Sequence, residues 1–317
     1  MSSVRWAFCT KKWIPTKSEW LHALACIQDE ERDRVMKFVY KKDAKSALIG
    51  RLLLKKVIVE NTSIPYSAIK LGRTERGKPY LLHAKESLNF NISHQGDFVV
   101  LAAESSRNVG VDVMKTEIKG NQTIPEFFHT MRRQFTPHEW QTIKQNPSDF
   151  KQLEMFMRHW CLKESYVKAL GVGIGLLKKL QFMEFHIAPQ STELNDRVSR
   201  VYLLSFGKEI FRETRLGFAR AKERLPVEWS DHRSGMDTKL FLESKPCDEW
   251  CFQETKLDED HQVVVALHQS NSPQENENLQ NGTFILLTIK DLLPPSMSFQ
   301  TVNEMFWKEF EEKSESS

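Results

Sequence analysis

The order of the expected secondary-structure elements occurs twice along the chain: a strand, then helices, then strands. The first round opens with a strand at Val4–Cys9, and apolar residues at a 3-and-4 spacing predict a long helix over Ala44–Glu60. The second round opens with a strand at Val109–Met114 and leads to a long helix over Asp149–Leu170. This order favours an α+β fold built from two similar halves.

Two short segments support the repeat. Residues 96–102 read GDFVVLA and residues 260–266 read DHQVVVA. Two unrelated amphipathic strands would give the same match, so the repeat is one of two interpretations. On the first interpretation, we expect an N-terminal α+β half over residues 1–108, a C-terminal α+β half over residues 109–268, and a partly disordered C-terminal extension over residues 269–317.

Composition excludes several classes of protein. The chain has 317 residues, enough for about two domains. Its net charge of +3 is too small for a nucleic-acid-binding protein. No apolar run reaches the ~18 residues of a membrane span, and no secretory signal is recognisable at the start of the sequence. The 5 cysteines are odd in number and scattered, which is typical of reduced thiols in a cytosolic protein.

The second long helix carries one row of side chains that could form a site. Trp160, Glu164 and Lys168 are each four residues apart, so they share one face of the helix. Glu164 borders the apolar stripe, where burial can alter the properties of a carboxylate. The alternative is an exposed Glu164–Lys168 ion pair worth about 0.3–0.5 kcal/mol.

A second carboxylate stands in a strand of valines. Asp112 is costly to bury there unless a cation or a hydrogen-bond donor meets it. We expect Gly110, two residues back on the same face, to leave room for a ligand; the alternative is an aspartate that caps a turn. Magnesium commonly binds one or two protein carboxylates together with phosphate oxygens and water, so Asp112 and Glu164 are candidate magnesium ligands.

A basic turn precedes these carboxylates. Residues 72–79 nearly match a phosphate-binding P-loop, but Pro79 lacks the hydroxyl that the motif needs. Arg73, Arg76 and Lys78 could still bind a phosphate through charge-assisted hydrogen bonds. A solvated basic turn is the alternative.

A polar run interrupts the apolar sequence of the next expected strand. Asn91 and Ser93 should point to one side, and Ile92 and His94 to the other. Such a run often marks only a turn. Because it continues directly from strand residues, it is a candidate binding segment.

Four sequence blocks in this order resemble the 4′-phosphopantetheinyl transferases of the surfactin-synthetase-activating type. The blocks are Gly77-Lys78-Pro79, Phe90-Asn91-Ile92-Ser93-His94, Val109-Gly110-Val111-Asp112, and Trp160 through Lys168 with Gly171. Over residues 4–187 and 250–268 the chain is most similar to vertebrate cytosolic members of this family. The resemblance implies the two-half transferase fold.

The resemblance also implies a reaction and roles for single residues. Coenzyme A would bind between the halves, and a carrier-protein serine would attack its β-phosphate and release adenosine 3′,5′-bisphosphate. Asp112 and Glu164 correspond to the ligands of Mg²⁺, Glu164 also to the general base, and Lys168 to the lysine near the transferred phosphate, with Lys163 as its neighbour. The positions that correspond to coenzyme A contacts are Arg34, Arg73, Thr74, Glu75, Arg76, Gly77, Lys78, Asn91, Ile92, Ser93, His94, Asp112, Glu164, Ser165 and Lys168.

The chain departs from the family pattern in two places. Met114 stands where bacterial members often have a second acidic residue, so water would have to fill that coordination position. Residues 197–210 and 217–238 are longer and more irregular than the pattern, and we assign them no function.

The partners implied are coenzyme A and apo carrier domains, such as those of acyl carrier protein, fatty acid synthase or an aminoadipate-semialdehyde dehydrogenase-like enzyme. We expect a cytosolic monomer with no nucleic-acid or membrane partner. Residues 124–140, with Phe127, Phe128 and Phe135, are a candidate docking surface, and core packing is the alternative for these aromatic residues. Basic pairs could steer an acidic carrier: Lys41-Lys42, Arg132-Arg133 and Lys178-Lys179. A non-catalytic module that binds coenzyme A or a nucleotide, or an adaptor, is the alternative function.

Overall fold

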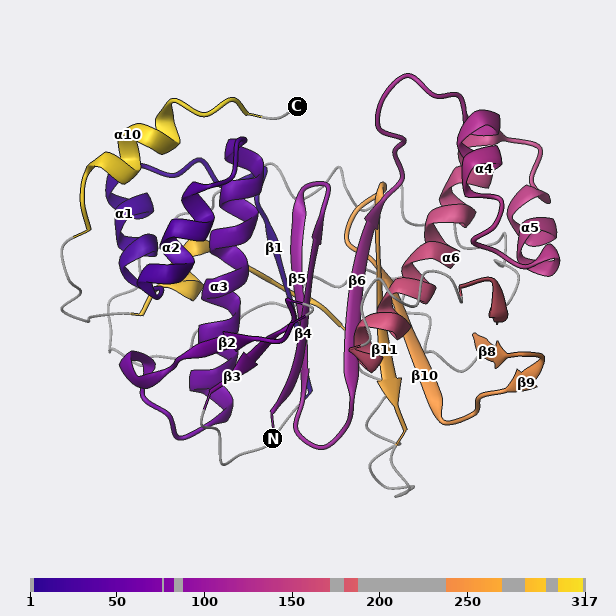
Figure 1. Ribbon diagram of the computed structural model, residues 1–317, viewed down its shortest axis with the longest axis horizontal. Coiled ribbons are helices and arrows are strands. Elements are labelled where there is room, and N and C mark those ends of the chain that lie inside the picture. Colours follow the sequence, from indigo (N-terminus) through magenta and orange to yellow (C-terminus); the bar gives the residue numbers. More distant parts are fainter. Residues whose placement is uncertain are drawn as a thin grey trace, which may run out of the picture.

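The computed structural model describes residues 3–75, 77–82, 88–171, 180–187, 238–269, 283–294 and 302–315. Their elements form two halves that meet along the strands at the centre of the molecule (Figure 1). Arg76, the pair Lys178-Lys179, residues 197–210 and residues 217–237 lie outside the described part of the chain.

The N-terminal half contains a sheet with the order β12-β1-β5-β4. Its strands are β1 (Val4–Cys9), β4 (Asn89–Gln95), β5 (Phe98–Glu104) and β12 (Ile285–Leu287). β1, β5 and β4 pair antiparallel, whereas β12 pairs parallel with β1. Three helices cover one face of the sheet: α1 (Lys17–Ala25), α2 (Asp29–Met36) and α3 (Lys41–Asn61). A short helix η1 (Tyr66–Ala68) leads to the hairpin of β2 (Leu71–Arg73) and β3 (Pro79–Leu81).

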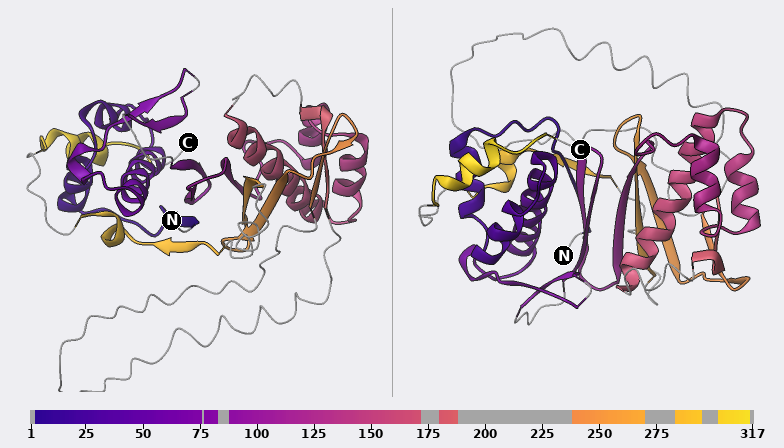
Figure 2. Two further views of the ribbon diagram at one scale, coloured as in Figure 1. Left: turned by 90° about the horizontal axis from the view of Figure 1, so that it is seen from below. Right: turned by 45° about the horizontal axis from the view of Figure 1, so that its top comes forward.

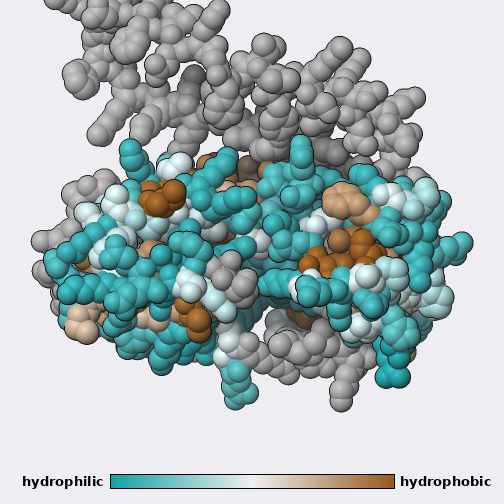
Figure 3. Space-filling view, turned by 90° about the horizontal axis from the view of Figure 1, so that it is seen from above, coloured by the Kyte–Doolittle hydropathy of each residue, from teal (hydrophilic) through white to brown (hydrophobic). Residues whose placement is uncertain are grey.

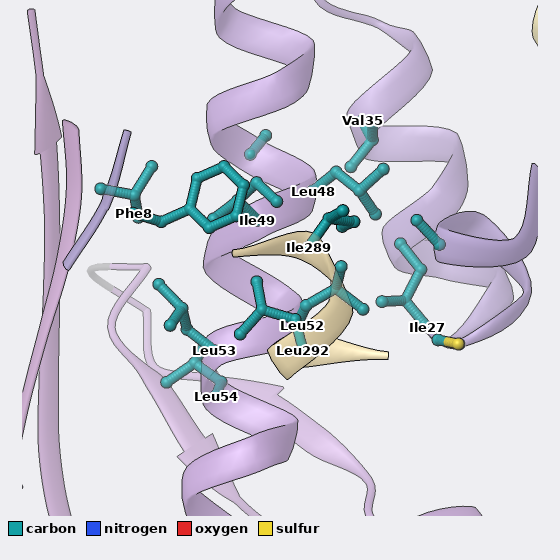
Figure 4. Close-up of a cluster of buried hydrophobic side chains, with 14 of the residues drawn as sticks. Phe8, Ile27, Val35, Leu48, Ile49, Leu52, Leu53, Leu54, Ile289 and Leu292 are labelled. Carbon is teal, nitrogen blue, oxygen red and sulfur yellow. The ribbon is translucent and has the colours of Figure 1, made fainter. Parts of the chain in front are cut away.

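The apolar stripe of α3 forms the core of this half, as the sequence spacing predicts. Leu48, Ile49, Leu52 and Leu53 are completely buried. Figure 4 shows them packed between Phe8 of the sheet and residues of other helices. The helix begins three residues earlier than expected and ends one residue later, a common uncertainty at helix ends.

The C-terminal half contains a sheet with the order β10-β11-β6, in which all pairs are antiparallel. Its strands are β6 (Val109–Lys115), β10 (Trp250–Lys256) and β11 (His261–His268). The long helix α6 (Asp149–Leu170) packs on this sheet and has the predicted bounds. It ends at Gly171, whose positive φ of 68° suits glycine at a helix C-terminus. The remaining elements are α4 (Ile124–Met131), α5 (Pro137–Lys144), and the small sheet of β7 (Met183–His186), β8 (Lys239–Leu242) and β9 (Lys245–Pro246).

Three apolar clusters hold these elements in four layers: helices, sheet, sheet and helices. One cluster fills the space between α1–α3 and the first sheet, and another the space between α6 and the second sheet. The third joins the two sheets to each other through residues of β1, β5, β6 and β11, such as Val100, Val111 and Val265. The view in Figure 2 shows the helices on the outer sides of the central strands.

The internal repeat is confirmed at the level of topology. The two similar segments lead into β5 and β11, and each of these is an inner strand with antiparallel neighbours on both sides. A long helix then covers the outer face of each sheet, α3 in the first half and α6 in the second. The boundaries at residues 108 and 268 stay predictions.

The described part of the C-terminal extension belongs to the first half. β12 extends its sheet, and α9 (Ile289–Leu292) adds two side chains to its core. In α10 (Met305–Glu311), Phe310 stacks on Trp20 of α1 with ring centroids 3.8 Å apart. Ser314 then accepts a hydrogen bond from the backbone of Lys41. The extension therefore returns to the half in which the chain begins.

The aromatic residues of the candidate docking surface are mainly core residues. Phe128 and Phe135 are buried against Phe156 of α6. Phe127 is partly buried on the same cluster. The alternative of core packing is thus confirmed for Phe128 and Phe135, because α4 and α5 bury their apolar faces on α6.

The surface of the molecule is mainly polar. Figure 3 shows hydrophilic residues over most of one face, with hydrophobic residues in a few separate patches. Among the described residues, no helix combines the length and apolar character needed to cross a membrane.

Gly110 does not leave room for a ligand, and this prediction is wrong. A Cβ atom at Gly110 would lie 2.1 Å from the backbone oxygen of Ser165 and 2.3 Å from the backbone nitrogen of Ala169. The glycine instead lets the backbone of α6 approach β6 closely. This close approach sets the distance between the helix and the strand that carry Lys168 and Asp112.

Substitution Gly110→Ala is therefore expected to destabilise the protein by about 3 kcal/mol or more, because two backbone segments would have to separate. The free energy of unfolding, measured with urea, tests this. Gly50→Ala in α3 is the matched control, since its Cβ would meet only the end of the Ile92 side chain at 3.2 Å. An equal loss of stability in both variants would contradict the role of Gly110.

Candidate active site

A cavity of 530 Å³ lies between the two halves. Its walls include Arg51 of α3, Arg73 and Lys78 of the β2–β3 hairpin, His94 of β4, and Glu164 and Lys168 of α6. Trp160 also lines it, so the row predicted along α6 faces the cavity. Segments that are distant in the sequence therefore meet at one place.

Lys168, Asp112 and Ser93 form a hydrogen-bonded group across the junction of the halves. The Nζ atom of Lys168 lies 2.6 Å from Oδ1 of Asp112 and 2.7 Å from Oγ of Ser93. The hydroxyl of Ser93 donates to the same Oδ1 over 2.8 Å. Since Asp112 is only 4% exposed, these hydrogen bonds and the ion pair offset the cost of burying its carboxylate. In the described part of the chain Lys168 makes its close ion pair with Asp112, and its charge acts on Glu164 without such a contact.

The second carboxylate oxygen of Asp112 has no hydrogen-bond partner. Oδ2 is buried and unsatisfied within the part of the chain that the structure describes. Buried polar atoms are normally paired, so an unpaired oxygen on a carboxylate that contacts Lys168 of the cavity wall suits a cation.

Glu164 lies close enough to Asp112 for the two charges to interact. Burial raises the pKa of Glu164, and the negative charge of Asp112 raises it further, while Lys168 opposes the shift. Two carboxylates whose charges repel each other fit a divalent cation such as Mg²⁺. Among the described residues no group of three or more His, Cys, Asp or Glu could hold a metal, so the other ligands would be water or phosphate oxygens. Met114 packs on apolar clusters and supplies no oxygen.

Glu31 organises the basic wall of the cavity. Its carboxylate accepts hydrogen bonds from Arg51 Nε at 2.6 Å and from Arg73 Nη2 at 2.9 Å. Burial alone would raise the pKa of Glu31, but the two guanidinium groups lower it to about 2. Arg34 lies 3.8 Å from the same carboxylate, and its side chain is 53% exposed and is not part of the cavity wall.

Arg51 and Glu31 are absent from the residues predicted from the sequence. Arg51 interrupts an apolar run in α3, and an arginine in that position of a buried helix is a signal that could have identified it. Glu31 gives no comparable signal, because its partners come from three separate elements.

The β2–β3 turn presents Lys78 to the cavity. Gly77 adopts a positive φ of 82°, and the backbone nitrogen of Lys78 donates to Oγ of Thr74 at 3.1 Å. Thr74 and Glu75 are exposed, so Thr74 shapes the turn without lining the cavity. Burial lowers the pKa of Lys78, which has no acidic partner within 4.0 Å in the described ranges.

In the polar run of β4, alternate side chains point to the cavity and to β6. Ile92 and His94 line the cavity, and burial lowers the pKa of His94, with Lys168 adding to the effect. The side chains of Asn91 and Ser93 reach β6, where Oδ1 of Asn91 accepts from the backbone nitrogen of Val111 at 3.1 Å. The side chain of Asn91, which also borders the cavity, thus links β4 to the backbone of β6.

Two residues of the α6 block point away from the cavity. Lys163 is fully buried and lies 2.7 Å from Oε2 of Glu139, and its Nζ also donates to three backbone carbonyls. The expectation that Lys163 neighbours the transferred phosphate is wrong, because its ammonium group is buried against Glu139 and Lys163 does not line the cavity. Ser165 is also fully buried, and its hydroxyl donates to the carbonyl of Leu162 at 2.8 Å.

Comparison with known proteins gives matches over nearly the whole chain. The model of the N-terminal region of 4′-phosphopantetheinyl transferases matches residues 11–106, and that of the 4′-phosphopantetheinyl transferase superfamily matches residues 108–211. The L-aminoadipate-semialdehyde dehydrogenase-phosphopantetheinyl transferase of Mus musculus is 40% identical over 97% of this chain and 90% of its own length. The protein of that name from Homo sapiens is 39% identical over the same shares. The 4′-phosphopantetheinyl transferase Sfp of Bacillus subtilis is 29% identical over 58% of this chain and 78% of its own length.

The Glu31 group predicts a pH-dependent loss of stability. Substitution Glu31→Gln leaves Arg51 and Arg73 without their carboxylate, and we expect it to cost roughly 1–3 kcal/mol near neutral pH. Because the folded pKa of about 2 lies below the ordinary value of 4.5, the stabilisation by Glu31 is complete above 4.5 and is lost as the pH falls toward 2. Urea unfolding of both proteins between about pH 6 and about pH 3 should show the difference shrinking. A constant difference over this range would contradict the assignment.

Proposed function

Because the chain belongs to the 4′-phosphopantetheinyl transferase superfamily, we propose that Asp112, Glu164 and Lys168 form its active site in the cavity between the halves. Members of this family transfer the phosphopantetheine arm of coenzyme A to carrier proteins, and the protein is such a transferase. The observation that carries the site assignment is the Lys168–Asp112–Ser93 group with Glu164 beside it. A module that only binds a nucleotide has no need of this arrangement.

In the transfer, the hydroxyl oxygen of a carrier serine forms a bond to the β-phosphorus of coenzyme A. The bond from that phosphorus to the bridging oxygen breaks, and adenosine 3′,5′-bisphosphate leaves. The serine proton needs an acceptor, and Glu164 is the carboxylate of the cavity wall that can take it, directly or through water. Such reactions depend mostly on positioning and on neutralising charge, with no protein nucleophile.

Asp112 and Glu164 would hold Mg²⁺. The unpaired Oδ2 of Asp112 and the carboxylate of Glu164 are suitable donors, and Oδ1 is already occupied by Lys168 and Ser93. When bound, the ion neutralises charge on the diphosphate and stabilises the leaving group.

The basic side chains of the cavity would bind the phosphates of coenzyme A. Arg51 and Arg73 are held by Glu31 with fixed guanidinium planes, and Lys78 faces the cavity from the hairpin turn. Lys168 would contact the transferred phosphate from α6. Arg34, Thr74 and Glu75 stay predictions as contacts, because in the described structure they lie outside the cavity wall.

The acceptors would be apo carrier domains. The names of the mammalian relatives support an aminoadipate-semialdehyde dehydrogenase-like enzyme as one source of such a domain, with acyl carrier protein and fatty acid synthase as others. We further propose that the protein acts as a monomer in the cytosol, where its 5 cysteines would stay reduced thiols.

Substitution Glu164→Gln should lower the rate of transfer at least about 100-fold, because the variant loses the base and a metal ligand. Its melting temperature should stay within a few degrees of the unsubstituted protein. The measurement is the mass of an apo acyl carrier protein after incubation with coenzyme A and Mg²⁺, which increases by one phosphopantetheine group per transfer.

Glu154→Gln on the same helix is the matched control. Glu154 accepts from Lys151 at 2.9 Å and pairs with Lys256, so this variant should lose stability and keep activity. Unfolding of Glu164→Gln would show that Glu164 has a structural role, and full activity of that variant would contradict its role as base and metal ligand.

A further inference from the structure

Strands β4 and β6 are neighbouring edges of two separate sheets. β4 ends the first sheet and β6 ends the second, and no backbone ladder joins them. Figure 1 shows them close together at the centre of the molecule, where the two halves meet. An unpaired edge leaves backbone N–H groups that need partners when they are buried.

Side chains of β4 take the place of the missing ladder. Asn91, Ser93 and Gln95 are at every second position, so they point to the same side of the strand. Oδ1 of Asn91 accepts a hydrogen bond from the backbone nitrogen of Val111, and Oε1 of Gln95 accepts one from the backbone nitrogen of Lys115. Between these two bonds, Ser93 donates to the carboxylate of Asp112.

The two amide bonds define one register. Both join residues that are 20 positions apart, so β4 and β6 run parallel with a constant offset. In a strand, alternate N–H groups point to opposite edges. One set of β6 N–H groups points to β4, and the other set points to β11. A slip of one residue would therefore break both amide bonds, and a slip of two would move Asp112 about 7 Å from Ser93.

We propose that Gln95 and Asn91 are positioning residues that fix the register of β6 against β4 and so hold Asp112 in place for metal binding. They act through the backbone of β6, on both sides of the metal ligand. The inference rests on the proposed role of Asp112 as a ligand of Mg²⁺. Gln95 tests it better than Asn91, since Asn91 borders the main cavity and Gln95 does not.

The test compares three variants of Gln95. Gln95→Met keeps the length of the side chain and removes the acceptor, Gln95→Glu keeps an acceptor oxygen, and the milder Gln95→Asn shortens the side chain without making it apolar. The melting temperature of each variant is measured with saturating coenzyme A at increasing concentrations of MgCl₂. The readout is the MgCl₂ concentration at which the melting temperature has risen by half of its maximal increase. This readout does not depend on transfer to a carrier.

Gln28→Met is the matched control. Oε1 of Gln28 also accepts a backbone N–H, that of Leu71 at 2.8 Å, but it lies within the first half. We expect Gln95→Met to raise the half-saturating MgCl₂ concentration about 3–10-fold, Gln95→Asn to raise it less, and Gln95→Glu to restore it to within about 2-fold. Gln28→Met should lower the melting temperature and leave the magnesium requirement unchanged.

Asp112→Asn separates this inference from the proposed function. If MgCl₂ stabilises the unsubstituted protein and Asp112→Asn alike, Asp112 is not a metal ligand and the proposed metal site is wrong. If Asp112→Asn abolishes the effect while Gln95→Met and Gln95→Asn match the unsubstituted protein, only the positioning role is overturned. A failure of Gln95→Glu to restore the magnesium requirement would overturn it as well.

Discussion

The contact between Lys168 and Asp112 is the interaction on which the candidate site depends. A buried aspartate is stable in a strand of valines only if its charge is compensated, and Lys168 and Ser93 do so from two other elements. The same contact ties α6 and β6 of one half to β4 of the other. Charge compensation and the joining of the halves are therefore one structural feature, which leaves only Oδ2 of Asp112 without a hydrogen-bond partner in the described structure.

Helix α6 carries functional side chains on one side and core residues on another. One side carries Trp160, Glu164 and Lys168 toward the cavity. Another side is buried, where Lys163 forms an ion pair with Glu139 and ties α5 and β7 to the helix. Gly110 allows the backbone of this helix to lie directly on β6. The position of Glu164 relative to Asp112 is consequently fixed by packing on several sides.

The sequence predicts features that depend on local patterns and fails on those that depend on which elements meet. The bounds of α6 follow from its apolar spacing and from Gly171. The role of Gly110 was beyond such reasoning, because nothing local shows that a helix would cover it. Lys163 was misplaced because neighbours in a motif face about 100° apart on a helix. The Glu31 group requires three elements to converge, which spacing cannot show.

The return of the C-terminal segment to the first half has a consequence for synthesis. β12, α9 and Phe310 complete the sheet and the core of the half whose other strands are made first. During translation, the strands and the long helix of the second half leave the ribosome before these pieces exist. The half that is begun first therefore receives its last strand and core residues only after the strands and the long helix of the second half have been made.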